Sequence, residues 1–126
     1  MNDSVVHAEA TLLVGIPFVR GGRDFRRVHG GTDCLGVGVE FRRRIGRMIP
    51  DPWEQIERLG PDAAAAEALA CYHLCGERKL GACAVHGERV YWYAGGGWAL
   101  TADHAAGTRL VPVRSIHPQA SMWWDR

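Results

Sequence analysis

The sequence lacks an excess of charge of one sign and a long apolar run, and each absence excludes a class of protein. The chain has 15 cationic residues, of which 14 are arginine, and 14 acidic residues, so the net charge is +1. A dedicated nucleic-acid binder would carry a basic surplus. No apolar run approaches the roughly 20 residues that span a bilayer. Residues 1–4 show no cationic region followed by apolar residues, so we expect synthesis in a bacterial cytoplasm without a signal peptide.

Length and composition indicate one globular domain. The chain has 126 residues, of which 47% are apolar and 23% charged. These fractions are ordinary for a folded domain and unlike those of a disordered chain. We therefore expect a single domain over residues 1–126, with a core that needs no disulfide staples although four cysteines are present.

Helices are expected in the first half of the chain. Ser4 is the expected N-cap of a helix whose apolar residues recur at helical spacing up to Leu13. Pro17 closes this helix, because proline disfavours helix for the residue before it. A second helix is predicted over residues 33–44, and a third from about residue 61 to 74 or 75, where a glycine follows in the C-cap position.

The second half has the pattern of an antiparallel sheet. Short β-branched and aromatic runs alternate with turns that contain Gly95–Gly97 or Asp103 to Gly107. The runs cover residues 82–86, 89–94, 98–102 and 109–113. The sequence therefore predicts an α+β fold, with a helical part over about residues 4–76 packed on a sheet part over about residues 80–118.

The segment around Cys34 is the most specific chemical signal. A cysteine in the first turn of a helix lies at the positive end of the helix dipole, which favours the thiolate and so makes a nucleophile. Gly30 and Gly31 let the backbone approach a substrate and offer N–H groups to a developing oxyanion. With Asp33 they are the expected substrate-binding residues, and Cys34 is the candidate nucleophile.

These residues resemble a known family. Pro17-Phe18, Gly21-Gly22, Asp33-Cys34-Leu35-Gly36 and Ile49-Pro50 together look like the NlpC family of papain-like cell-wall peptidases. The resemblance is strongest to the branch encoded with phage tails, prophages and gene-transfer particles, and it covers about the first 55 residues. It implies a papain-like NlpC-type fold with Cys34 opening a helix as the nucleophile.

The resemblance also implies two histidines on successive strands, one as the base and one to orient it. Aligning Gly95–Gly97 with the turn of the family places Arg89 at the first histidine position and Thr101 at the second. Arginine does not accept a proton near neutral pH, because its pKa stays above about 12. The catalytic histidine positions are thus expected to be replaced.

Three other histidines are alternative bases. His86 lies three residues before Arg89, and on a continuous strand this odd offset places the two on opposite faces unless a bulge near Gly87 intervenes. His104 lies in a predicted turn from which it would swing toward Cys34. His29 precedes Cys34 by five residues, whereas the family order places the base after the cysteine. Each of the three is otherwise an exposed surface histidine.

A second cluster of soft ligands consists of Cys71, His73, Cys75 and Cys83. On a helix Cys71 and Cys75 share a face while His73 points elsewhere, and no CxxC pair is present. These residues are candidate zinc or iron–sulfur ligands, but packing of small apolar side chains accounts for them better. No cofactor or metal is expected.

The sequence therefore leaves two functions open. The first is a structural subunit of a phage-type tail tip or gene-transfer particle, with a peptidase fold that is weakened or silent in catalysis and other tail-tip proteins as partners. The second is an active thiol endopeptidase that cleaves the stem peptides of peptidoglycan, with Cys34 as nucleophile and His86 or His104 as base. The paired tryptophans Trp123 and Trp124 are an expected core cap or partner anchor.

Overall fold

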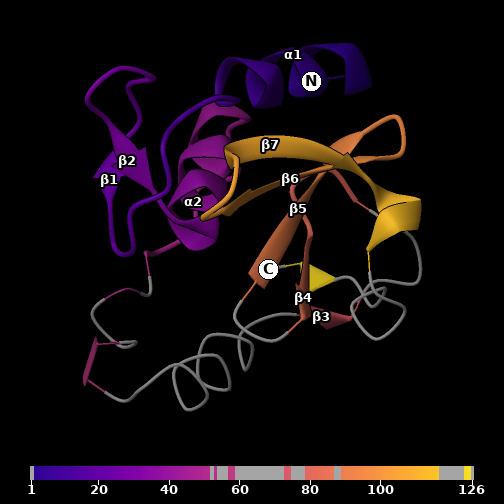
Figure 1. The fold of residues 1–126 in the computed structure, drawn as a ribbon. Helices are drawn as coiled ribbons and strands as arrows, with labels where there is room; N and C mark the ends of the chain where they lie inside the picture. The colour runs from indigo at the N-terminus through magenta and orange to yellow at the C-terminus, as the bar shows by residue number, and fades with distance from the viewer. Residues whose placement is uncertain are drawn as a thin grey trace.

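A computed structural model gives the arrangement of the chain (Figure 1). It describes residues 2–51, 53, 57–58, 73–74, 79–86, 89–116 and 124–125. The elements, in chain order, are α1 (Asp3–Leu12), β1 (Arg23–Asp24), β2 (Gly31–Thr32), α2 (Cys34–Arg44), β3 (His73–Leu74), β4 (Cys83–His86), β5 (Arg89–Gly95), β6 (Trp98–Asp103), β7 (Gly107–Pro112), η1 (Val113–Ser115) and β8 (Trp124–Asp125).

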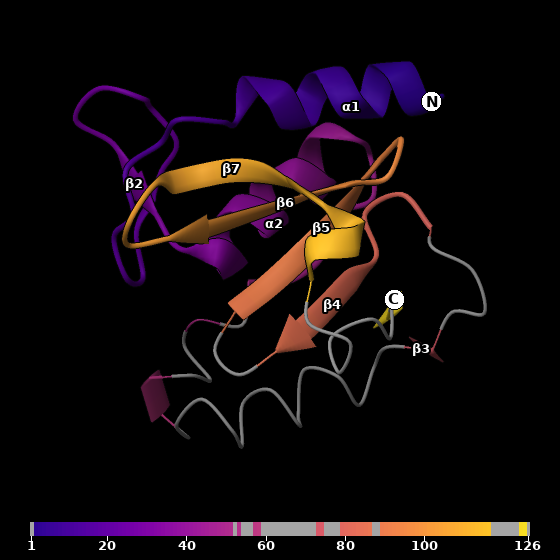
Figure 2. The same ribbon diagram turned by 45° about the vertical axis from the view of Figure 1, so that its right-hand side comes forward.

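Antiparallel pairing joins the strands of the second half into one sheet with the order β3-β8-β4-β5-β6-β7. Strands β4 to β7 follow one another as hairpins, which Figure 2 shows as a meander. Their bounds lie within two residues of the predicted runs, because alternating apolar residues and glycine turns specify them locally. The predicted α+β class is confirmed.

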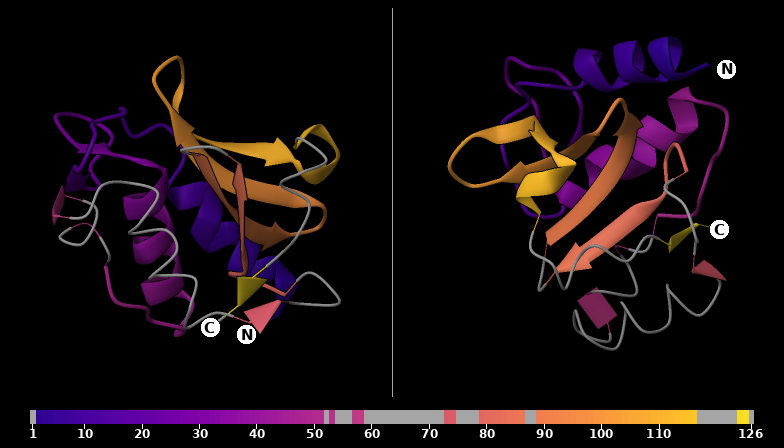
Figure 3. Two further views of the ribbon diagram at one scale, coloured as in Figure 1. Left: turned by 90° about the horizontal axis from the view of Figure 1, so that it is seen from below. Right: turned by 90° about the vertical axis from the view of Figure 1, so that its right-hand side faces the viewer.

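Both helices cover the same face of this sheet (Figure 3). Val6 and Ala10 of α1 lie one turn apart, as do Val37 and Phe41 of α2, so each helix presents an apolar stripe. The residues buried with them from the sheet are Cys83, Trp92, Ala94, Leu100 and Ala102. A second, smaller cluster packs on the opposite face, with Ala82, Ala84, Ala99, Val111 and Ile116 buried and Tyr91 and Tyr93 partly buried.

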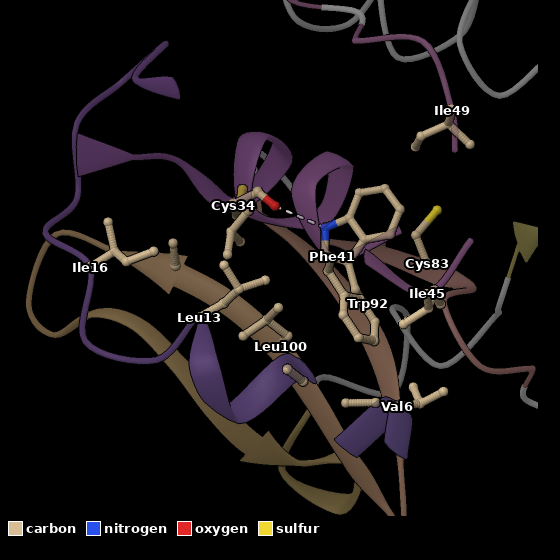
Figure 4. Packing of buried hydrophobic residues seen from close by; sticks show 14 residues of the cluster. Val6, Leu13, Ile16, Cys34, Phe41, Ile45, Ile49, Cys83, Trp92 and Leu100 are labelled. Atoms are coloured by element: carbon tan, nitrogen blue, oxygen red, sulfur yellow. Dashed lines mark hydrogen bonds between the residues drawn. The ribbon is translucent and has the colours of Figure 1, made fainter. Parts of the chain in front are cut away.

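A close approach between Gly38 and Trp92 fixes α2 on the sheet. A Cβ atom built on Gly38 would lie 1.8 Å from the Trp92 indole, so only glycine fits at this point of the helix. The indole Nε1 donates a hydrogen bond of 2.8 Å to the carbonyl oxygen of Cys34 (Figure 4). Trp92 is 1% exposed, and its packing therefore orients the first turn of α2.

Three local features differ from the sequence predictions. Helix α1 begins at Asp3 rather than after Ser4, because the Asn2 side chain accepts the Val5 N–H at 3.0 Å and caps the helix two residues earlier. A short β1–β2 hairpin lies between the first two helices, where no strand is predicted, with Arg23 opposite Thr32. His73–Leu74 is strand rather than helix end, because it pairs with β8. The rest of the predicted third helix lies outside the described residues.

In the described part of the chain, no helix is long and apolar enough to cross a membrane.

Replacing Gly38 by alanine tests the packing of α2. Although alanine favours helix by about 1 kcal/mol over glycine, the added methyl group collides with Trp92. We expect Gly38→Ala to lower the free energy of unfolding by about 1–3 kcal/mol in urea denaturation. Ser4→Ala on the exposed side of α1 is the control and should change it by less than about 0.5 kcal/mol. A Gly38→Ala protein as stable as the parent contradicts this packing.

Candidate active site

Cys34 is the first residue of α2, and Asp33 is the N-cap that starts the helix. Asp33 Oδ1 accepts the N–H of Gly36 at 2.7 Å, and Oδ2 accepts the N–H of Gly21 at 2.8 Å. Arg23 Nη1 adds a charged hydrogen bond of 3.0 Å to Asp33 Oδ1. The carboxylate of Asp33 therefore holds the helix start and the glycine loop before it in one arrangement.

The Cys34 side chain lies against the beginning of β5. Its Sγ accepts a hydrogen bond of 3.3 Å from the backbone N–H of Val90, and the residue is 8% exposed. The residues of β5 and β6 that belong to the same hydrophobic core cluster as Cys34 are Val90, Trp92, Ala94, Leu100 and Ala102. The thiol is thus part of the hydrophobic core between α2 and the sheet.

Burial raises the pKa of the Cys34 thiol above its ordinary value. The Val90 N–H favours the thiolate, the negative charge of Asp33 opposes it, and the positive charge of Arg89 favours it. The helix dipole alone predicts an acidic thiol at this position. The structure differs from that expectation because removal of the thiol from water outweighs the favourable groups.

Arg89 and Thr101 lie on the sheet face that points away from α2. Successive side chains of a strand alternate between faces, and Val90 and Leu100 pack in the core cluster of Cys34. Thr101 is fully buried, and its hydroxyl donates to the Val90 carbonyl at 2.8 Å. Arg89 and Thr101, which align with the histidines of the family, therefore lie on the face of the sheet opposite to the one that packs against Cys34.

Arg89 belongs to a charged cluster around Asp103. Asp103 Oδ2 accepts a hydrogen bond of 2.8 Å from Arg109 Nε and lies 2.7 Å from Arg109 Nη2 in the same ion pair, and Oδ1 accepts the N–H groups of Ala105 and Ala106. Arg89 Nη2 lies 3.8 Å from the same carboxylate, beyond hydrogen-bond length. Burial raises the pKa of Asp103, but the Ala106 N–H and the Arg109 guanidinium outweigh it and hold the pKa below its usual range.

The candidate histidines occupy three different places. His86 is exposed and is paired with Arg89 between the antiparallel strands β4 and β5. The two residues therefore lie on the same face of the sheet, because they belong to two strands of a hairpin and not to one continuous strand.

His104 is exposed in the β6–β7 turn, with its ring centroid 4.1 Å from that of Phe18. Phe18 pairs with Thr32, two residues before Cys34. His29 is exposed, with a φ of +65°. Their roles as bases remain predictions.

The predicted substrate-binding glycines are tightly packed by backbone and side chains. A Cβ on Gly30 would lie 1.9 Å from the Arg26 carbonyl oxygen, and one on Gly31 would lie 2.2 Å from the Val19 side chain. Of the candidate metal ligands, Cys83 is buried in the core, while Cys71 and Cys75 lie outside the described residues. Within the described ranges, no group of three or more histidine, cysteine, aspartate or glutamate residues is placed to hold a metal ion.

Solved structures share this arrangement. The crystal structure of the NlpC/p60 domain of the peptidoglycan hydrolase SagA aligns with a TM-score of 0.61 and 20% identity, covering 98% of this chain and 97% of that one. The chain has the fold of NlpC/p60 domains. The peptidoglycan hydrolase RipB from Mycobacterium tuberculosis aligns with a TM-score of 0.60 and 22% identity over 98% of this chain and 63% of the RipB chain. No protein-family model and no curated protein sequence matches.

Several contacts of this NlpC/p60 fold could not be identified from the sequence. The bond from the Val90 N–H to the thiol and the bond from the Trp92 indole to the Cys34 carbonyl each join a backbone atom to a side-chain atom across 56 and 58 residues, and such contacts leave no sequence pattern. Arg23 pairs with Asp33 and Asp51 over 10 and 28 residues. The N-cap is the exception, because an aspartate directly before an amphipathic helix is a local signal.

Replacing Asp103 by asparagine tests the charged cluster. The folded state holds the Asp103 pKa low, so the carboxylate contributes stability above the ordinary aspartate pKa and loses it as pH falls through the lowered value. We expect Asp103→Asn to lower the free energy of unfolding by about 1–3 kcal/mol at pH 7 and by less at pH 3, measured by urea denaturation.

Asp24→Asn is the matched control, because Asp24 also pairs with an arginine, Arg26, but is largely exposed. Its effect at pH 7 should stay below that of Asp103→Asn, in keeping with the weakness of surface ion pairs. Equal stability of Asp103→Asn and the parent at pH 7 would show that the cluster does not stabilise the sheet.

Proposed function

We propose that this protein is a structural component of a phage-type tail tip or gene-transfer particle, with the NlpC/p60 fold and weak or absent peptidase activity. Its partners are other tail-tip proteins, and it contacts peptidoglycan during cell-wall penetration. In this proposal it is made in the bacterial cytoplasm and assembled into a virion or virion-like tail. The tail assignment rests on the resemblance of the Asp33-Cys34-Leu35-Gly36 segment and the glycine loop before it to the phage-tail branch of the family.

The burial of the Cys34 thiol carries the catalytic part of the proposal. Acyl transfer by a thiol needs a thiolate, or a base that removes the thiol proton as the sulfur attacks. Burial raises the pKa of Cys34, and β5 and β6 turn Val90, Leu100 and Ala102 toward its core cluster. Arg89 and Thr101, at the positions aligned with the catalytic histidines, point to the other face. Both observations support slow or absent hydrolysis.

An active peptidoglycan endopeptidase is the second candidate, and the structural neighbours favour it, since SagA and RipB are both named peptidoglycan hydrolases. In that reaction Cys34 Sγ attacks the carbonyl carbon of a stem-peptide bond, and its proton passes to His86 or His104. The leaving amine then takes that proton, and water hydrolyses the thioester.

Digestion of purified cell walls separates the two candidates. We expect the protein to release soluble muropeptides no faster than Cys34→Ala does, because its thiol is buried and largely protonated at neutral pH. The assay is chromatography of the soluble fraction, with an active NlpC/p60 hydrolase as positive control. Release that depends on Cys34 would overturn the proposal of weak catalysis and support the endopeptidase.

The structural role is tested in particles. Mass spectrometry of purified tails should detect the protein, and the Cys34→Ala variant should assemble as the parent does. Deletion of the gene should leave tails without a complete tip. Absence of the protein from intact tails would contradict the tail assignment independently of the result with cell walls.

A further inference from the structure

Arg23 connects three segments that are distant in the sequence. Its guanidinium donates Nη1 to Asp33 Oδ1 at 3.0 Å and Nη2 to Asp51 Oδ1 at 3.0 Å. The Nη1 group also donates to the Gly22 carbonyl at 2.7 Å. Arg23 lies on β1, Asp33 caps α2, and Asp51 follows the end of α2, so one side chain fixes both ends of the helix region against the glycine loop.

The surroundings of Arg23 leave the guanidinium little freedom. A Cβ on Gly36, in the first turn of α2, would lie 2.5 Å from Arg23 Nη1, so glycine admits the guanidinium beside the helix start. The ring of Trp53 lies 5.7 Å from the guanidinium carbon on another side. Arg23 is thus held against the residues that surround Cys34 rather than extended into solvent.

Asp33 has two opposing effects on the Cys34 thiol. It organises the helix start through its bond to the Gly36 N–H, and its negative charge next to Cys34 disfavours the thiolate. Arg89, from β5, acts on the thiol in the opposite direction. Burial and the Val90 N–H act more strongly on the pKa of Cys34 than these two charges do, and a change in either charge shifts the thiolate fraction further.

We propose that Arg23 is a positioning residue for Cys34: it keeps the Asp33 carboxylate on the amides of α2, compensates its negative charge, and so maintains the reactivity of the thiol. The role is exerted through Asp33, since Arg23 bonds to that carboxylate and not to the sulfur. It concerns the chemistry of the thiol and does not depend on the proposed tail function or on peptidase activity.

The test is the pH dependence of Cys34 alkylation by iodoacetamide in the folded protein. Peptide mapping isolates the site, because tryptic cleavage after Arg27 and Arg42 gives a peptide that contains Cys34 and none of the other three cysteines. The rate below the midpoint of the profile reports the thiolate fraction, and the plateau at high pH reports access to the sulfur. A loss of structure would raise the plateau, whereas a change of compensating charge moves the midpoint.

Arg23→Gln should slow alkylation of Cys34 at pH 7.5 by about two- to fivefold and move the midpoint upward, with the plateau unchanged. Asp33→Asn should accelerate it by a similar factor, because the negative charge is gone while the single asparagine oxygen still caps the helix at Gly36 and gives up the bond to Gly21. In the Asp33→Asn background the effect of Arg23→Gln should be smaller than in the parent, because the part that Arg23 exerts by holding the carboxylate is gone while its own charge still acts on the thiol. Arg23→Lys should lie between the parent and Arg23→Gln.

Arg26→Gln is the matched control, because Arg26 lies in the same loop and pairs with exposed Asp24, and it should leave the profile unchanged. Equal midpoints for the parent and Arg23→Gln would overturn the proposal, as would an equal effect of Arg23→Gln with and without Asp33. If Arg23→Gln fails to fold, Arg23→Lys and Asp33→Asn test the proposed role of Arg23 instead. A rate of Cys34 alkylation at pH 7.5 that is unchanged in Asp33→Asn contradicts that role.

Discussion

The carboxylate of Asp33 is the interaction on which the rest of the site depends. Its two oxygens accept the N–H groups of Gly36 and Gly21, and Arg23 neutralises it. These bonds define where α2 begins and therefore where Cys34 lies. The opposite side of the same helix turn is fixed by Trp92, which donates to the Cys34 carbonyl from the sheet. The glycine loop, the start of α2 and the sheet thus come together at Asp33 and Cys34.

Two physical effects act in opposite directions on the pKa of the Cys34 thiol. A helix start with backbone N–H groups favours a thiolate, and the Val90 N–H reinforces this. Packing of α2 on Trp92 and Leu100 removes the thiol from water, which favours the protonated form. Burial prevails in the folded protein. Cys34 therefore lies at a helix start whose geometry favours the thiolate, while burial has the largest effect on its pKa, followed by the Val90 N–H, Asp33 and Arg89.

Local patterns predicted the elements of the fold but not the facing of the site residues. An N-cap aspartate before an apolar stripe indicated α2, and the turns at Gly95–Gly97 and Asp103 to Gly107 indicated three of the hairpin strands. Facing has a period of two, and Arg89 and Thr101 fall on the opposite face from Val90 and Leu100, which pack in the core cluster of Cys34. The hairpin that pairs His86 with Arg89 invalidated the continuous-strand argument for the same reason. Contacts of Arg23 with Asp33 and Asp51 are set by tertiary packing and have no local signature.

The most direct test of this account is a pH titration of the Cys34 side chain by carbon-13 NMR, in protein labelled at the cysteine Cβ. Loss of the resonance in Cys34→Ser assigns it. The account predicts that Cys34 titrates at a higher pH in the folded protein than in the same protein unfolded in urea, because burial raises its pKa. A folded-state midpoint below the unfolded one would show that the helix start outweighs burial, and would contradict the account.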